Sequence, residues 1–259
     1  MIETFRNAWR VPELRKKLLF TFFIIIIYRV GGTVPVPYLD SVALSAWFEQ
    51  SASSGDFFSY LNVLSGGNFS KATLLALSVS PYINAQIIIQ LLTYALPPLE
   101  RLQKEGPEGR KKLNKITKYA SLAIAIFQAW AYYLTMKKAG ACVYTEGFSK
   151  IFAEIVIIAC FTAGASLTIW LGDEINEKGI GNGISMLLFA GIIARGPSAV
   201  IGLFDYMKTG EAKNIILVIA ILVVFILMIG FIIFMNEAER RIPIQYAKRV
   251  VGRKQYGGQ

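Results

Sequence analysis

One face of the apolar stretch 74–96 carries side chains that could control passage across a membrane. At 100° of rotation per residue in a helix, a stripe about 60° wide contains Val79, Ile83, Gln86 and Gln90. Amides that face lipid are costly, so both glutamines are expected to face protein or a hydrated cavity. A hydrogen bond to a neighbouring helix explains them equally well. In the first case, the apolar pair beside the amides predicts a dry constriction that blocks ions by dewetting.

A second apolar stretch, 184–204, predicts a similar arrangement. Leu188 and Arg195 are seven residues apart and therefore share a helix face, with Arg195 about 10 Å nearer the outside. A charged side chain at that depth must snorkel or point into water. Counted along their helices, Ile83 and Leu188 lie roughly 15–20 Å from the cytoplasmic ends, near the bilayer midplane. The two stretches together predict an hourglass with an apolar waist.

Little in this chain could perform acid–base or metal chemistry. There is no histidine, which removes the commonest general base and metal ligand. Cys142 falls in a predicted external loop and Cys160 within a predicted span, so they are badly placed to pair or to bind a metal. We therefore expect no catalytic residue, no metal site and no cofactor, and an enzyme embedded in the membrane is disfavoured.

The composition is that of a polytopic helical membrane protein. Of the 259 residues, 54% are hydrophobic, and several apolar runs are near the length that spans a bilayer as a helix. We predict an all-α fold with six spans: Leu18–Val36, Leu74–Leu96, Tyr119–Met136, Ile151–Leu171, Ile184–Phe204 and Ile215–Met235. Residues 1–17 are predicted to form a cytosolic interfacial helix that leads into the first span.

Lysines and arginines are distributed unevenly between the loops. With the N-terminus in the cytoplasm, nineteen lie in cytoplasmic segments and five in external ones. This bias follows the positive-inside rule, so both termini are predicted to be cytoplasmic. The net charge of +10 is therefore mainly a signal of topology, and most single basic residues are expected only to orient helices.

The external segment 35–71 contains a short apolar patch. Its members are Phe57, Phe58, Tyr60, Leu61, Val63 and Leu64, and the patch stops at a Ser-Gly-Gly-Asn sequence at 65–68. The patch is too short to span a bilayer but has enough apolar surface to need cover. A re-entrant helix that folds back into the protein and an amphipathic cap on the outside are equally good interpretations.

Residues 172–184 join two spans and contain four glycines and an acidic cluster. Such a composition indicates a backbone that bends sharply at the membrane surface and lets another chain approach closely. The sequence around it, WLGDEINEKGIGNGISMLL at 170–188, resembles a signature of the SecY family, the central subunits of the bacterial protein-conducting channel. LSVSPYINAQIIIQ at 77–90 resembles a second signature of that family.

The similarity extends along the whole chain in the same order. FRNAWRVPELRKKLLFTFFIIIIYRVGGTVPVP at 5–37 is similar to the first span of the family, and RRIPIQYAKRVVGRK at 240–254 to its cytosolic loop after the sixth span. Two residues depart from the family pattern. Ser78 stands where the family usually has glycine, and it is small enough for helix packing to be kept. Tyr38 stands where glycine commonly follows the second proline, which affects the local turn.

The resemblance implies roles for three groups of residues. The pore ring of the family falls on Val79, Ile83 and Leu188. Its mobile plug helix falls near residues 55–69 and includes Phe57, Phe58, Tyr60, Leu61 and Leu64. One wall of the lateral gate, through which signal sequences reach lipid, falls on Pro81, Asn84, Ile87 and Gln90.

The resemblance also implies partners and a location. The cytosolic loop that meets the SecA motor or the ribosome falls on Arg240, Arg241, Lys248, Arg249, Arg253 and Lys254. The last two of these are expected to pair with phosphates of ribosomal RNA. SecE and SecG subunits, secretory and membrane protein chains with signal sequences, and membrane lipids are the other implied partners. The implied location is the cytoplasmic membrane, as a multi-pass protein.

Members of the family have ten spans in two inverted halves, whereas six are predicted here. We therefore expect four parts: the interfacial helix 1–17, a five-span half at 18–204, the sixth span with its external loop at 205–235, and a truncated basic loop at 236–259. The alternative function is a secondary transporter with a small-molecule site at the midplane, for which helices broken at Pro81 and Pro197 would be the argument. Saturable substrate flux would indicate the transporter, and crosslinking to a stalled secretory chain would indicate the channel.

The basic tail provides a first test. Residues 236–259 hold six basic and two acidic side chains, more than an anchor for the preceding span requires. In a channel that contains this chain, Arg253→Glu combined with Lys254→Glu should weaken ribosome binding roughly tenfold, because several phosphate contacts act together. Topology should be kept, since Arg240 and Arg241 still flank the span. Binding over a salt series measures this, and an unchanged affinity and salt slope would reduce both residues to a solvated flank.

Overall fold

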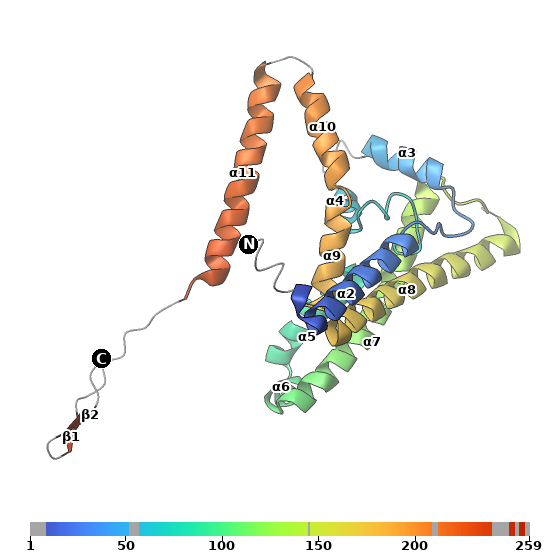
Figure 1. The fold of residues 1–259 in the computed structure, drawn as a ribbon. Helices are drawn as coiled ribbons and strands as arrows, with labels where there is room; N and C mark the ends of the chain where they lie inside the picture. Colours follow the sequence, from blue (N-terminus) through green and yellow to red (C-terminus); the bar gives the residue numbers. More distant parts are fainter. Residues whose placement is uncertain are drawn as a thin grey trace. The chain divides into compact units, whose positions relative to one another are not determined.

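The computed structural model describes residues 9–51, 57–144, 146–208, 212–239, 249–251 and 254–256 (Figure 1). The chain divides into two compact units, Met1–Ser198 and Ala199–Gln259. The helices within the first unit are α2 (Pro12–Gly31), α3 (Ser41–Ser51), α4 (Phe57–Leu64), α5 (Ser80–Ala95), α6 (Pro97–Lys104), α7 (Pro107–Lys138), α8 (Gly147–Lys178) and α9 (Gly183–Ile193). Helix α10 (Gly196–Lys208) begins at the end of this unit, and α11 (Ala212–Glu237) lies in the second unit.

The predicted all-α class is confirmed, with one small exception. Strands β1 (Arg249–Val251) and β2 (Lys254–Tyr256) pair antiparallel, with Val250 opposite Gln255. This hairpin lies in the tail that the sequence predicts to be a basic loop. Within the part of the chain that the structure describes, three stretches are long and apolar enough to cross a membrane: Gly147–Lys178, Gly183–Lys208 and Lys213–Glu237.

Prolines mark where four helices begin. Pro12, Pro97 and Pro107 are the first residues of α2, α6 and α7, and Pro81 is the second residue of α5. Proline suits these positions because its ring fixes a helical φ and its missing N–H would have had no partner in the first turn. Pro81 therefore starts a helix and does not break one.

The prediction of one continuous helix over Leu74–Leu96 is wrong, because α5 begins only at Ser80. The preceding segment, residues 65–79, is a series of turns, which we call the connector. Ser78 has a φ of 49°, in the left-handed region that ends a right-handed helix. Upstream, the Leu74 N–H donates to the Val34 carbonyl at 2.8 Å, so this donor is paired outside any helix.

Two other predicted spans also differ from the structure. The first helix ends at Gly31 and not at Val36, because residues 34–36 run beside the connector and Pro35 forms a β-bridge with Thr73. The fifth is interrupted between Ile193 and Gly196, where α9 ends and α10 begins.

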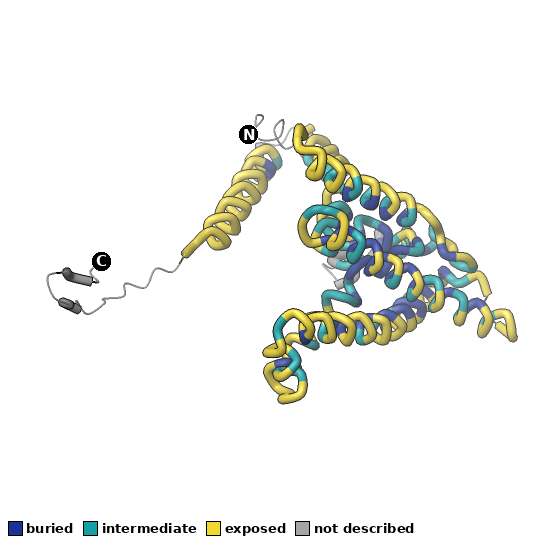
Figure 2. The backbone as a smooth tube through the Cα atoms, turned by 60° about the horizontal axis from the view of Figure 1, so that its bottom comes forward, coloured by how far each residue is buried: buried dark blue, intermediate teal, exposed yellow. Residues whose placement is uncertain are grey.

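Buried side chains form two hydrophobic clusters within the first unit. The first cluster includes Phe69, Tyr132, Met136, Ile157 and Phe161, and packs the connector between α7 and α8. The second consists of Ile24, Tyr28, Leu75, Val79, Leu171, Ile175 and Leu187. Figure 2 shows the buried residues where the helices of this unit face one another, whereas α11 is exposed along most of its length. Exposed apolar faces of this kind suit helices that contact lipid.

Glycines allow several segments to pack backbone against backbone. A Cβ on Gly164 of α8 would lie 1.8 Å from the carbonyl oxygen of Leu74. A Cβ on Gly183 would lie 1.9 Å from the carbonyl oxygen of Gly172, where α9 folds back on α8. No side chain fits in either place, so these contacts require glycine.

The glycine-rich turn is shorter than predicted, since α8 continues to Lys178 and only residues 179–182 connect it to α9. The turn packs closely against another part of the same chain. A Cβ on Gly179 would lie 2.6 Å from the Thr21 hydroxyl of α2, and this hydroxyl accepts a hydrogen bond from the Ile180 N–H at 3.1 Å. Gly181 has a φ of 76°, which supplies the sharp bend.

The contact at Gly164 generates a stability prediction. Gly164→Ala should destabilise the chain by about 2–3 kcal/mol, because α8 must move away from the Leu74 carbonyl to make room for the methyl group. Thermal unfolding in detergent measures this loss. Gly196→Ala is the matched control, since a Cβ there meets nothing within 4 Å. Equal melting temperatures for the two variants would contradict the packing described.

Candidate functional site

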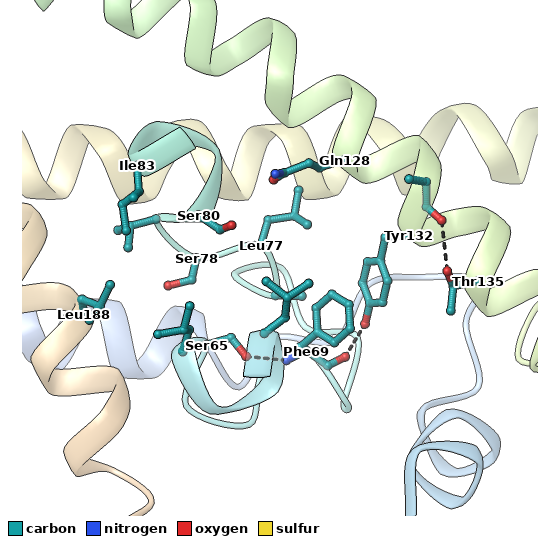
Figure 3. A pocket seen from close by; sticks show the side chains of 15 residues that line it. Ser65, Phe69, Leu77, Ser78, Ser80, Ile83, Gln128, Tyr132, Thr135 and Leu188 are labelled. Carbon is teal, nitrogen blue, oxygen red and sulfur yellow. Dashed lines mark hydrogen bonds between the residues drawn. The ribbon is translucent and has the colours of Figure 1, made fainter. Parts of the chain in front are cut away.

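A cavity of about 280 Å³ lies inside the first unit, between the connector, α7 and α9 (Figure 3). It is lined by Leu61, Leu64, Ser65, Phe69, Ala76, Leu77, Ser78, Val79, Ser80, Ile83, Gln128, Ala131, Tyr132, Thr135 and Leu188. The three residues predicted for the pore ring, Val79, Ile83 and Leu188, are all among them. Two predicted plug residues, Leu61 and Leu64, line the same cavity.

The three ring residues come from two chain segments that meet at the second hydrophobic cluster. Val79 is only 1% exposed, and Ile83 and Leu188 are half-buried and pack against the same cluster. Val79 is the residue before α5, so the helical stripe that led to it does not exist at that position. Its proximity to Ile83 arises from the turn that starts the helix, where the Ile83 N–H donates to the Val79 carbonyl at 3.1 Å.

The amides predicted to share this site lie elsewhere. Gln86 and Gln90 are exposed and are not part of the cavity wall. The polar groups that do line it are Ser65, Ser78, Ser80, Gln128 and Thr135. The last two, on α7, were missed in the sequence. Their seven-residue spacing, with Ala131 and Tyr132 between them, places them on one helix face and could have identified them.

The residues predicted for the lateral gate lie along α5. Asn84, Ile87 and Gln90 are exposed, whereas Pro81 is buried in the first turn. Ile88 and Leu91 are also exposed, at 47% and 64%. This part of α5 therefore presents a largely apolar surface that the described residues leave uncovered.

The short apolar patch forms α4, and its C-terminal end folds back into the protein. Leu61 and Leu64 line the cavity, so this end of the patch is covered within the protein, as the re-entrant interpretation expects. The backbone of Phe57, Phe58 and Tyr60 belongs to α4, but their side chains lie outside what the structure describes.

The end of α4 is joined to α7 by polar and aromatic contacts. The Ser65 hydroxyl accepts a hydrogen bond from the Phe69 N–H at 3.0 Å, and the Tyr132 hydroxyl donates to the Phe69 carbonyl. The rings of Phe69 and Tyr132 are stacked with centroids 4.1 Å apart. Nearby, the Asn62 side chain accepts a hydrogen bond from the Ser70 N–H at 3.0 Å.

On its other side, the end of α4 rests on α9 through two glycines. A Cβ on Gly66 would lie 2.6 Å from the Gly191 carbonyl oxygen, and a Cβ on Gly191 would lie 3.1 Å from the Leu64 carbonyl oxygen. Gly66 also has a φ of 68°, which a larger residue rarely adopts. The two backbones therefore touch without an intervening side chain.

Arg195 lies beside the same contact. It follows the end of α9 and is exposed, and its Nε would be 3.9 Å from a Cβ on Gly67. The prediction that Arg195 shares a continuous helix face with Leu188 is wrong, because the helix ends at Ile193.

Both cysteines are free thiols in the structure. Cys142 is half-buried in the turn after α7, and this burial raises the pKa of its thiol, against the opposing effect of Lys137. A raised pKa keeps the thiol protonated and unreactive near neutral pH. Among the residues that the structure describes, no three potential metal ligands gather at one place.

Of the basic tail after residue 239, the structure describes only the backbone of residues 249–251 and 254–256. Arg240, Arg241, Lys248 and Arg253 lie outside the described residues. Arg249 and Lys254 have a described backbone in β1 and β2, where Lys254 is paired with Val251, but nothing is described of their side chains.

Comparison with known proteins gives consistent results. The SecY family model matches residues 73–259. Protein translocase subunit SecY of Streptomyces coelicolor is 40% identical over 268 residues, which cover all of this chain and 60% of that protein. The chain thus spans about 60% of the length of the curated relatives that it matches first.

Among solved structures, the fold is similar to Sec61 in the canine ribosome-channel complex from the endoplasmic reticulum, with a TM-score of 0.59 and 19% identity. That match covers 89% of this chain and 49% of Sec61. A second structure, described as a protein conducting channel, gives a TM-score of 0.57 with 19% identity over 83% of this chain and 47% of its own.

The glycine contact between α4 and α9 can be tested directly. Gly191→Val should push the end of α4 away from α9, because its side chain must overlap the Leu64 carbonyl. Maleimide labelling of Ser65→Cys, in a background without Cys142 and Cys160, should then be several-fold faster, since residue 65 is 2% exposed in the structure. Gly202→Val is the control, because a Cβ there meets nothing within 4 Å. Equal labelling rates in the two variants would exclude the contact.

Proposed function

This chain belongs to the SecY family, and we propose on that basis that it forms part of a protein-conducting pore. Through this pore, unfolded polypeptides would cross the cytoplasmic membrane, and apolar segments would leave it sideways into lipid. The observation that carries the proposal is the single cavity that gathers Val79, Ile83 and Leu188 with the end of α4. The lining of this cavity includes all three residues, Val79, Ile83 and Leu188, on which the pore ring of the family falls.

The cavity suits a seal that must open for a polymer. Its constricting side chains are apolar and branched, so water has few partners there and ions meet a dewetted barrier. Apolar side chains also make no directional bonds that a passing chain would have to break. We propose that α4 acts as the plug, since the residues that follow it are tied to α7 by the bonds of Phe69 to Ser65 and Tyr132, and its Leu64 carbonyl lies close to Gly191 of α9.

We assign one wall of the lateral exit to α5. Asn84, Ile87 and Gln90 are exposed on a helix that begins beside the cavity at Pro81. A surface that mixes amides with apolar residues can meet a signal sequence on one side and lipid on the other. We assign no catalytic role to any residue of this chain.

We propose the ribosome or a SecA-type motor as the cytosolic partner, and SecE- and SecG-type subunits as membrane partners. The structure of Sec61 that this fold resembles is a ribosome-channel complex, and the tail of this chain carries six basic residues that could pair with phosphates. The charge bias between loops supports a cytosolic N-terminus. The transporter alternative is not proposed, because Pro81 starts α5 and the relatives found are translocase subunits.

The constriction can be tested in a reconstituted channel that contains this chain. Ile83→Asn and Leu188→Asn should each raise the resting ion conductance about tenfold, because an amide holds water where the native side chain repels it. Planar-bilayer recordings measure the conductance. Ile83→Leu and Leu188→Met are matched controls that keep the site apolar and should conduct like the native channel. If both asparagine variants also did so, these residues would not belong to the pore.

A further inference from the structure

Tyr28 and Ser78 form a buried pair of hydroxyl groups next to the constriction. The hydroxyl groups of Tyr28 in α2 and Ser78 in the connector are 2.9 Å apart. Tyr28 is 0% exposed and Ser78 is 3% exposed. This hydrogen bond is buried, unlike the side-chain pairs Lys104–Glu100, Lys178–Glu174 and Lys208–Asp205, which join charged residues on the exposed surface. In an apolar interior, such a bond is maintained because neither hydroxyl has water as an alternative partner.

Ser78 occupies a conformation that serine does not favour. Its φ of 49° lies in the left-handed region, where a Cβ crowds the backbone and glycine is the usual residue. Glycine would relieve this strain but could not reach Tyr28. The hydrogen bond is therefore what serine contributes at this position.

The pair is the last of several attachments between residues 28–36 and the connector. Upstream, the Leu74 N–H donates to the Val34 carbonyl at 2.8 Å, and the Val36 N–H donates to the Ala72 carbonyl at 3.1 Å. Closer to the pair, a Cβ on Gly31 would lie 3.0 Å from the Leu75 side chain. The end of α2 and the segment after it therefore lie along the connector, from the backbone bridge at residues 34–36 to Ser78.

The next residue after Ser78 is Val79, which lines the cavity and packs with Tyr28 in one hydrophobic cluster. Between Ser78 and the first residue of α5 there is only this one residue. No flexible segment separates Ser78 from α5, so a displacement of Ser78 also moves Val79.

We propose that the hydrogen bond between Tyr28 and Ser78 positions Val79 at the constriction and holds it closed. Tyr28 is a positioning residue that acts through Ser78, and it does not line the cavity. The role of the constriction as a seal rests on the proposed function, whereas the exposure of residue 79 can be measured without any transport assay.

Three variants separate the hydrogen bond from the backbone strain. Tyr28→Phe leaves the Ser78 hydroxyl buried without its hydrogen-bond partner. Ser78→Gly leaves the Tyr28 hydroxyl buried without its partner. The double variant, Tyr28→Phe with Ser78→Gly, removes both hydroxyls and the strain together. Ala72→Gly is the matched control, since Ala72 has a φ of 48° in the same connector but carries no hydroxyl.

The first readout is the rate at which maleimide modifies Val79→Cys, in the reconstituted channel with Cys142→Ala and Cys160→Ala. Residue 79 is 1% exposed, so labelling should be slow in the parent. Each single variant should label about tenfold faster, and the double variant should label about as fast as each single variant, because the same hydrogen bond is lost in all three. Ser78→Ala, which loses the bond but keeps the strain, should label at least as fast as Ser78→Gly. The Ala72→Gly control should not change.

The second readout is the resting ion leak of the same proteoliposomes, which should follow the labelling rates. Unchanged labelling in both single variants, or single effects that add in the double variant, would overturn the proposal. A double variant that labels like the single variants supports it, because independent losses of stability would add, and a return of the double variant to the parent rate would also overturn it. If labelling changes in this pattern but the leak does not, the positioning role stands and the constriction assigned to Val79 in the proposed function fails.

Discussion

Backbone that is not helical cannot be left facing lipid, and the architecture around the cavity depends on how this constraint is met. The connector, residues 65–79, contains no helix although it lies between two apolar stretches. Some of its donors are paired within the connector, as the Phe69 N–H is with the Ser65 hydroxyl, and others outside it: the Ser70 N–H with the Asn62 side chain and the Leu74 N–H with the Val34 carbonyl. The end of α2, the end of α4 and α7 must therefore all be in place before the connector can adopt this path.

Close packing of the surrounding helices follows from the same constraint. Lipid removes the hydrophobic driving force between helices, so they associate through close contact and interhelical hydrogen bonds. Glycine supplies the contact at three places: Gly164 against Leu74, Gly183 against Gly172, and Gly66 against Gly191. Charge contributes only at the edge of this arrangement, where Lys118 of α7 pairs with Asp173 of α8 at 2.6 Å with both side chains partly exposed. Several of the segments around the cavity can thus approach one another because glycine has no side chain.

Helices and their approximate limits could be predicted from the sequence, because apolar runs and starting prolines act locally. The grouping of Ile83 with Leu188 also followed from counting residues along two helices, although Val79 joined them by a turn and not by helical periodicity. The path of the connector could not be predicted, since residues 74–79 are apolar enough for a helix and only the distant partners Val34 and Tyr28 favour another conformation. The positions of Gln86 and Gln90 could not be predicted for a related reason: periodicity identifies which residues share a helix face, but not whether that face meets protein, water or lipid.

The way in which the connector is held also determines how it can move. A helix is held by a cooperative series of hydrogen bonds, whereas the connector is held by separate bonds to different neighbours, each contributing about 1 kcal/mol. Gly66, Gly67, Ala72 and Ser78 all have positive φ, so the local conformation gains little stability of its own. Loss of one attachment can then release a part of the connector while α5 and α7 remain folded. A seal built from such a segment can open locally, which a seal built from a continuous helix could do only by moving the whole helix.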